Sequence, residues 1–109
     1  MVESSAALDL VFKSFADATR RDILKRVCKS DLTISEIARP YGMSFAAIAK
    51  HVAVLERGRL VSKRRRGKEQ VISANPATMT MVATHVQRYE RVWQARYNRL
   101  ESLLTTQGA

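Results

Sequence analysis

A dense group of cations marks one short segment of this chain. Seven basic residues lie between Arg57 and Asn75, against one acid, Glu69. These seven are Arg57, Arg59, Lys63, Arg64, Arg65, Arg66 and Lys68. The segment therefore carries +6 of the formal net charge of +9. Charge gathered in one place indicates a polyanionic partner, either nucleic acid or an anionic membrane surface, although a basic run is also compatible with a merely solvated face.

Three other side chains are candidates for metal or nucleophilic chemistry: Cys28, His51 and His85. A single cysteine cannot form an intrachain disulfide or a cysteine-rich metal site, and it favours a reducing compartment. Cys28 follows Leu24 on an apolar helix face, so we expect a buried, inert thiol rather than a redox switch. His85 and Glu90 stand about 140° apart around a helix with no second histidine following, which favours a solvent or interface histidine over a ligand. The sequence thus predicts no metal site, no cofactor and no enzyme, because no nucleophile and base stand at a useful spacing.

The length and composition suit one folded domain. The chain has 109 residues, of which 46% are hydrophobic, and we expect a single domain over residues 1–109. No apolar run approaches the length of a membrane span, and the first 15 residues contain Glu3 and Asp9. We therefore expect neither a membrane span nor a signal peptide, and a cytoplasmic location.

Two helices are expected before residue 31. The first begins near Ser5, and its apolar stripe is formed by Leu8, Val11, Phe12 and Phe15. Asp17 is a good N-cap for the second helix. The inner face of that helix is expected to consist of Ile23, Leu24, Val27 and Cys28.

Two further short helices follow, separated by a turn. Thr33 and Glu36 form a capping-box pattern, which predicts a helix that ends at Pro40 and Gly42 with Ile34, Ile37 and Ala38 facing inward. Ser44 is the expected N-cap of the fourth helix, whose inner stripe is Ile48, Val52 and Leu55. Gly58 is expected to be its left-handed C-cap residue.

A hairpin and a long helix complete the chain. We expect strands at Leu60–Arg65 and Glu69–Ala74, joined across Arg66-Gly67-Lys68. Asn75-Pro76 is typical of a helix start. The last helix has apolar residues three and four apart, interrupted only by Arg96. They are Met79, Val82, Val86, Tyr89, Trp93, Leu100 and Leu103.

The order of these elements is that of a winged helix-turn-helix. The expected fold is mainly α with a small β-hairpin: a helix-turn-helix at about residues 33–57, a wing at 60–74 and a long dimerisation helix at 76–104. Three separated segments, Phe15–Leu24, Met43–Leu55 and Gly58–Val61, also resemble the ArsR-type (arsenic-repressor) family of bacterial transcription regulators. The resemblance spans about residues 8 to 104.

The resemblance implies a homodimer that binds double-stranded operator DNA at an inverted repeat and represses transcription. It places the fourth helix in the major groove and the wing on the flanking backbone or minor groove. The expected DNA-contacting residues are Thr33, Ser44, Phe45, Ala46, Ala47, Lys50, His51, Arg64, Arg65, Arg66 and Lys68. The expected dimer interface consists of Leu8, Val11, Phe12, Val86, Tyr89, Trp93 and Leu100. Members that resemble this chain are often autoregulators.

The chain departs from its family at the recognition helix and at the metal sites. Phe45, Ala49 and Ala53 are apolar where similar members tend to carry polar or basic residues. Phe45 is expected either to contact thymine methyl groups or to pack in the core. Metal-sensing members place paired cysteines on the third helix, where this chain has Thr33–Ile37 without cysteine, so the resemblance is to the metal-independent branch.

An alternative function is an RNA-binding or protein-interaction winged-helix module, in which the basic wing meets RNA or an acidic partner. Binding to a membrane surface is a weaker alternative, because the basic run lies on a hairpin rather than an amphipathic helix. The oligomeric state distinguishes the DNA-binding repressor from the RNA-binding or protein-interaction module, since a two-fold dimer favours duplex DNA.

Overall fold

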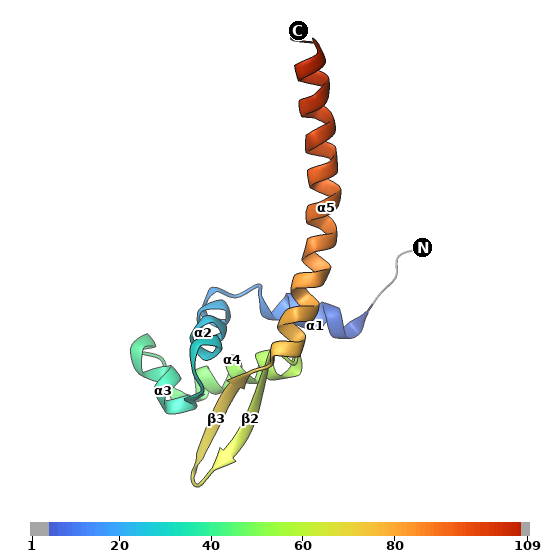
Figure 1. The fold of residues 1–109 in the computed structure, drawn as a ribbon. Coiled ribbons are helices and arrows are strands. Elements are labelled where there is room, and N and C mark those ends of the chain that lie inside the picture. The colour runs from blue at the N-terminus through green and yellow to red at the C-terminus, as the bar shows by residue number, and fades with distance from the viewer. Residues whose placement is uncertain (1–4, 108–109) are drawn as a thin grey trace. The chain divides into compact units, whose positions relative to one another are not determined.

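The computed structural model describes residues 5–107, and the chain forms two compact units, Met1–Thr78 and Met79–Ala109. The elements, labelled in Figure 1, are α1 (Ala6–Ser14), α2 (Ala18–Lys29), β1 (Leu32–Thr33), α3 (Ile34–Ala38), the 3-10 helix η1 (Arg39–Tyr41), α4 (Phe45–Arg57), β2 (Val61–Arg66), β3 (Glu69–Ala74) and α5 (Pro76–Gln107). This architecture confirms the expected fold class of a mainly α winged helix-turn-helix with a long last helix.

The helices begin where the sequence places their caps. Ser5, Asp17 and Ser44 each accept a hydrogen bond from a backbone amide in the first turn of α1, α2 and α4. Thr33 and Glu36 form the complete capping box of α3, with the Glu36 amide 3.1 Å from Thr33 Oγ1 and the Thr33 amide 2.9 Å from Glu36 Oε1. Each cap satisfies a backbone donor that would otherwise be left unpaired at a helix start.

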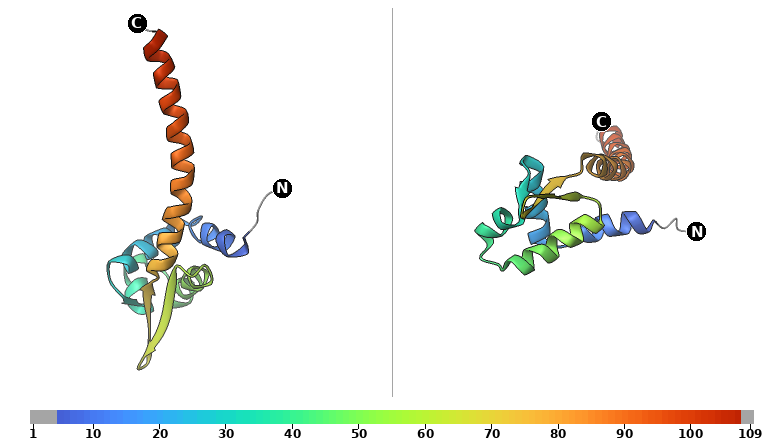
Figure 2. Two further views of the ribbon diagram at one scale, coloured as in Figure 1. Left: turned by 45° about the vertical axis from the view of Figure 1, so that its right-hand side comes forward. Right: turned by 90° about the horizontal axis from the view of Figure 1, so that it is seen from below.

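The sheet has three antiparallel strands in the order β1-β3-β2. In the hairpin, Val61 pairs with Ala74 and Arg66 with Glu69, so the turn is the two residues Gly67-Lys68. Gly67 has φ 64°, which a hairpin turn of this length requires and glycine adopts without strain. The tip projects beyond the helices of the same unit in the left view of Figure 2. The third strand, β1, was not expected, because its two residues carry no strand signal until they pair with β3.

The core of the first unit lies between α2, α3, α4 and the sheet. Most of the fully buried side chains of the unit are aliphatic and lie here: Ile23, Val27, Ile37, Ile48, Val52, Leu55, Leu60, Val71 and Ile72. The inner stripes expected for α3 and α4 are therefore confirmed at Ile34, Ile37, Ile48, Val52 and Leu55. No buried polar side-chain atom within residues 5–107 lacks a hydrogen-bond partner.

The end of α4 differs from the expectation that Gly58 is left-handed. Gly58 has φ −77°, and Arg59 takes the left-handed conformation with φ 59°. Glycine stands at position 58 because of close packing: a Cβ there would lie 2.7 Å from Ser14 Oγ and 3.2 Å from the Leu10 carbonyl oxygen. Ser14 is itself buried and donates to the carbonyl oxygens of Leu10 and Val54, which joins α1 to α4.

The expectation that Cys28 is buried is wrong, because its side chain is exposed. The buried line of α2 runs through Ile23, Leu24 and Val27. Cys28 lies about 90° from the centre of that line and one residue before the end of the helix.

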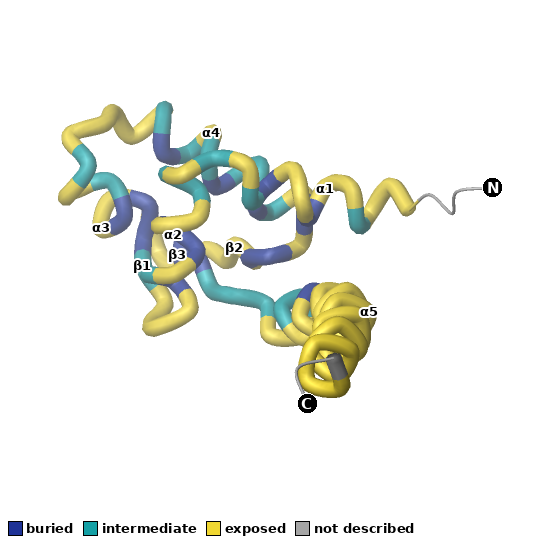
Figure 3. Tube along the Cα trace, turned by 90° about the horizontal axis from the view of Figure 1, so that it is seen from above, coloured by how far each residue is buried: buried dark blue, intermediate teal, exposed yellow. Residues whose placement is uncertain are grey.

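Helix α5 has 32 residues and, as Figure 3 shows, is exposed along most of its length. Its exposed large apolar residues include Val86, Tyr89, Trp93, Leu100 and Leu103. Within the described part of the chain, no helix is both long enough and apolar enough to cross a lipid bilayer.

Candidate nucleic-acid interface

The turn between α3 and α4 is held in place from α2. The Tyr41 hydroxyl donates to Asp22 Oδ2 at 2.5 Å, and the guanidinium carbon of Arg26 lies 5.2 Å from the centre of the Tyr41 ring. Arg26 also donates to the carbonyl oxygens of Ile37 (2.8 Å) and Glu36 (3.1 Å) at the end of α3. Burial, followed by the hydrogen bond to Asp22, raises the pKa of Tyr41. These contacts anchor η1 and the end of α3 on α2, and the sequence does not predict them because the partners are 10 to 19 positions apart.

The first half of α4 presents an exposed surface. Phe45, Ala46 and Lys50 are exposed, and Ala47 and Ala49 are half-buried. Phe45 is 56% exposed, so it does not pack in the core, which was one of its two expected roles. The exposed surface is mostly apolar, and Lys50 is its long polar side chain.

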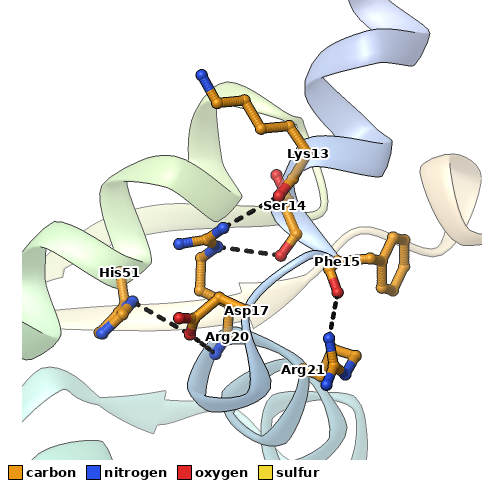
Figure 4. A network of polar contacts seen from close by, with 7 residues as sticks. All are labelled: Lys13, Ser14, Phe15, Asp17, Arg20, Arg21 and His51. Atoms are coloured by element: carbon orange, nitrogen blue, oxygen red, sulfur yellow. Dashed lines mark hydrogen bonds and ion pairs between the residues drawn. The ribbon is translucent and has the colours of Figure 1, made fainter.

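His51 lies at the edge of this surface and is half-buried. Its Nδ1 is 3.7 Å from Asp17 Oδ2, the oxygen that also accepts the Arg20 amide at 2.9 Å (Figure 4). The Arg20 backbone hydrogen bond is the largest cause that lowers the pKa of Asp17, and the neighbouring His51 and Arg20 lower it further. The sequence predicted Asp17 as an N-cap, but nothing in it indicated that this carboxylate contacts a histidine 34 positions later.

Two arginines hold the turn that carries Asp17. Arg20 donates from Nε to the Ser14 carbonyl oxygen and from a terminal nitrogen to that of Lys13, both at 3.0 Å. Arg21 donates to the Phe15 carbonyl oxygen at 2.6 Å (Figure 4). These bonds satisfy carbonyl groups at the end of α1 that have no partner within the helix.

The cations of the hairpin differ in their partners. Three have carboxylates nearby: Lys63 lies 3.7 Å from Glu56 of α4, Arg64 lies 3.1 Å from Asp31, and Arg66 lies 3.9 Å from Glu69. Arg64 also donates to the Ser73 hydroxyl at 2.6 Å. Arg65 donates to the Gly67 carbonyl oxygen at 3.1 Å. Within residues 5–107, no ion pair forms at Arg65 or Lys68, so these two cations are the most available to a polyanion.

The remaining expected DNA-contacting residues serve as caps. Thr33 is 4% exposed and its hydroxyl accepts from the Glu36 amide, so its side chain is committed to α3. Ser44 is exposed and its hydroxyl accepts from the Ala47 amide at 3.1 Å. The structure thus brings the exposed half of α4 and the hairpin together in one unit, linked by the Lys63–Glu56 pair.

The residues expected at a dimer interface fall into two groups. On α5, Val86, Tyr89, Trp93 and Leu100 are all exposed, Trp93 at 67%. On α1, Phe12 is exposed and Leu8 is half-buried, whereas Val11 is 2% exposed. A side chain that is already buried within one chain has little surface left to contact a second chain. Of the α1 residues expected at the dimer interface, only Leu8 and Phe12 therefore remain candidates.

In the part of the chain that the structure describes, no three His, Cys, Asp or Glu residues lie close enough together to hold a metal ion. Cys28 is on α2, His51 is on α4 beside Asp17, and His85 is on α5 beside Tyr89. The neighbour of His51 is therefore a carboxylate, and the neighbour of His85 is an aromatic ring.

A short helix, a glycine turn, a second helix with an exposed first half and a basic hairpin define a winged helix-turn-helix DNA-binding protein. Residues 17–63 match the bacterial regulatory protein, arsR family. The HTH-type transcriptional regulator Rv2034 of Mycobacterium tuberculosis (strain ATCC 25618 / H37Rv) is 29% identical over 100 residues, which cover 92% of this chain and 91% of that protein. The transcriptional repressor SdpR of Bacillus subtilis (strain 168) is 32% identical over 69 residues, 63% of this chain and 77% of that protein. This chain belongs to the arsR family of bacterial transcriptional regulators.

Solved structures agree with this assignment. An ArsR-like transcriptional regulator from Rhodococcus sp. RHA1 superposes with a TM-score of 0.76 at 29% identity, covering 93% of both chains. A homodimeric winged helix-turn-helix DNA-binding domain, Mb0332 from Mycobacterium bovis, shares the fold with a TM-score of 0.64 at 22% identity, covering 84% of this chain and 94% of that one. The family consists of regulators rather than enzymes, which confirms the expectation that this chain is not an enzyme.

Proposed function

We propose that this protein is a homodimeric, cytoplasmic repressor that binds double-stranded operator DNA at an inverted repeat and does not sense metals. The observation that carries the proposal is the exposed first half of α4, with Phe45, Ala46 and Lys50 outermost, in the same unit as a cationic hairpin. A helix of this kind fits the major groove of B-DNA, and a basic hairpin fits the adjacent phosphates.

Base recognition would be largely apolar. The Phe45 ring and the Ala46 methyl group suit thymine methyl groups, and Lys50 suits the acceptor edge of guanine. Because so few polar side chains are exposed on α4, sequence-dependent DNA shape would supply part of the specificity. Ser44 contributes through its position at the start of α4, where backbone amides favour a phosphate.

The hairpin would contribute phosphate contacts. Arg65 and Lys68 can bind a phosphate without first breaking an ion pair. Arg64 and Arg66 must leave Asp31 and Glu69, respectively, before they can bind one. Two hairpins in a dimer give several contacts, so affinity is expected to fall about 10³- to 10⁵-fold between about 50 and 200 mM salt if about 6 to 10 contacts form.

The exposed apolar stripe of α5 supports the assembly. Val86, Tyr89, Trp93 and Leu100 would meet the same residues of a second copy around a two-fold axis. Leu8 and Phe12 of α1 are the residues of the first unit that we expect to contact the second copy. Mb0332, which shares this fold, is homodimeric. Two-fold protein symmetry in turn requires an inverted repeat in the DNA.

Repression is supported by similarity to SdpR, a transcriptional repressor, and autoregulation is the simplest form of it. Metal independence is supported by the sequence of α3, which lacks cysteine, and by the position of His85 beside Tyr89. Zinc, cadmium and arsenite are therefore expected to leave a protein–duplex complex intact in a mobility-shift assay, and release by micromolar metal would overturn metal independence.

Fluorescence anisotropy with a labelled mixed-sequence duplex and a single-stranded RNA of the same length tests the nucleic-acid class. The proposal predicts tighter binding to the duplex. Lys50→Ala should reduce the preference for a specific duplex by about 1 to 3 kcal/mol and leave the thermal unfolding curve unchanged. Equal or tighter binding to RNA would favour the RNA-binding alternative instead.

A further inference from the structure

His51 lies on the flank of the exposed face of α4 rather than at its centre. Neighbouring residues in an α-helix are rotated by about 100°, so His51 stands that far round the helix from Lys50, on the side of Asp17. A helix in the major groove presents its central line to base edges and its flanks to the two phosphate backbones. If α4 lies in the groove, as the proposed function requires, His51 meets a phosphate before it meets a base.

One edge of the imidazole is already engaged by the protein. Nδ1 faces Asp17 Oδ2 at 3.7 Å, and Figure 4 shows the second ring nitrogen, Nε2, directed away from Asp17. A neutral imidazole that carries its proton on Nδ1 offers Nε2 only as an acceptor, whereas an imidazolium donates from both nitrogens. A phosphate has only acceptors, so it selects the imidazolium form.

The imidazole also faces an anion of the protein. Asp17 is an anion at neutral pH, since the Arg20 amide and the nearby cations lower its pKa. Asp17, at the start of α2, is the charged group that lies beside His51, and Arg20 in turn lies beside Asp17. Arg20 directs its guanidinium to the carbonyl oxygens of Ser14 and Lys13, which leaves the Asp17 carboxylate to the imidazole.

We infer that Asp17 and His51 form a proton-dependent phosphate clamp, in which Asp17 is the positioning residue and His51 Nε2–H donates to a DNA phosphate. When DNA binds, Nε2 takes up one proton from solvent, and the imidazolium is then held between two anions. This inference rests on the proposed DNA-binding function and assigns His51, one of the expected DNA-contacting residues, to the DNA backbone.

The decisive variant is Asp17→Asn, because general electrostatics and the clamp predict opposite changes in its affinity for DNA. Asparagine is as good an N-cap as aspartate, so α2 keeps its cap while the carboxylate charge is lost. General electrostatics predicts that removal of an acid strengthens DNA binding. The clamp predicts binding to a fluorescein-labelled mixed-sequence duplex that is roughly three- to tenfold weaker, since the imidazolium loses its counterion. Asp9→Asn, which removes an exposed acid from α1, is the matched control and should bind as tightly as the unmutated protein or more tightly.

The dependence on pH and salt separates a clamp from a merely structural pair. The unmutated protein should bind the duplex more tightly at about pH 6 than at about pH 8, and His51→Gln should remove most of that difference. His51→Gln should also lower the slope of log Kd against log salt by about 1 to 2, because each subunit loses one phosphate contact. Its loss of affinity should be similar for all duplex sequences.

A spectroscopic measurement covers the case in which a variant folds poorly. In the unmutated protein labelled with ¹⁵N, addition of the duplex should shift the Nε2 resonance of His51 towards the imidazolium position. Tighter binding by Asp17→Asn, or a Nε2 resonance unchanged by DNA, would overturn the clamp while leaving the proposed function in place. Failure of the unmutated protein to bind any duplex would overturn both.

Discussion

At the scale of single residues, the junction after α4 shows how packing overrides local preference. Gly58 has an ordinary right-handed backbone, and its missing side chain is what lets α1 approach: Ser14 Oγ and the Leu10 carbonyl occupy the space a Cβ would need. The neighbouring Arg59 bears the left-handed conformation with φ 59°, which costs a non-glycine residue about 1 kcal/mol.

The first prediction compares these two neighbours. Gly58→Ala should lower the free energy of unfolding by about 1 to 3 kcal/mol, because Ser14 is held by two hydrogen bonds and the Leu10 oxygen belongs to the backbone. Arg59→Gly should change it by less than about 1 kcal/mol, since relief of strain offsets the greater freedom of the unfolded chain. Urea denaturation of both variants provides the measurement, and an unaffected Gly58→Ala would refute the close-packing explanation.

The second prediction concerns two capping carboxylates. Hydrogen bonds from the Arg20 amide to Asp17 and from the Thr33 amide to Glu36 are the largest causes that lower the pKa of each group. A folded-state pKa below the unfolded value stabilises the protein above about pH 4, and this stabilisation is lost as pH falls through the folded pKa. The thermal unfolding midpoint, measured from pH 6 downwards, should therefore decrease once the pH is below about 4. Glu36→Gln, which retains capping, should make that fall shallower; an unchanged acid profile would contradict the assignment of Glu36.

At the scale of elements, the hairpin is a cationic arm with part of its charge compensated internally. Arg64 is paired with Asp31 and Arg66 with Glu69, while Arg65 and Lys68 have no carboxylate partner among residues 5–107. A cation that leaves a carboxylate to reach a phosphate gains less than one that was solvated.

The third prediction follows from this difference. The double variant Arg65→Ala/Lys68→Ala should weaken binding to a duplex and flatten its salt dependence more than Arg64→Ala/Arg66→Ala does, although both remove two positive charges. Anisotropy titrations between about 50 and 200 mM salt measure the two slopes. Equal slopes would mean that the internal pairs do not affect phosphate binding. A variant that keeps the slope and loses sequence preference would show that the hairpin reads bases.

The elements also show what could be predicted from the sequence. Helix starts depend on residues three positions apart, so Asp17, Ser44 and the Thr33–Glu36 box were predicted from the sequence, as were the inner stripe of α4 and both hairpin strands. Interactions between distant positions were not predicted: β1 pairs with β3 across some forty residues, Gly58 packs on Ser14, and Asp17 meets His51. Cys28 was misplaced because helical spacing alone does not locate the edge of a buried stripe.

At the scale of the whole molecule, the exposed stripe of α5 is the feature on which the proposed dimer rests. Trp93 lies near the middle of the stripe and is 67% exposed in a single chain. Large apolar side chains repeated along one helix face are costly to leave in water and are typical of an association surface.

The fourth prediction tests this surface. Trp93→Asp should give monomers, because a charge placed in an apolar interface loses its hydration without gaining a partner. Ala95→Asp adds the same charge on the opposite face of α5, about 200° round the helix, and should remain dimeric. Size-exclusion chromatography with light scattering distinguishes the two. A stable monomer for the unmutated protein would refute the assembly.

The central claim is that a two-fold dimer reads duplex DNA with two copies of α4. Selection of bound duplexes from a random-sequence pool, followed by sequencing, measures the preferred site directly. A two-fold dimer of this fold should enrich an inverted repeat whose half-sites are centred about 34 to 36 Å apart, one turn of B-DNA. Enrichment of an unpaired half-site, or of no sequence at all together with tighter binding to single-stranded RNA, would contradict it.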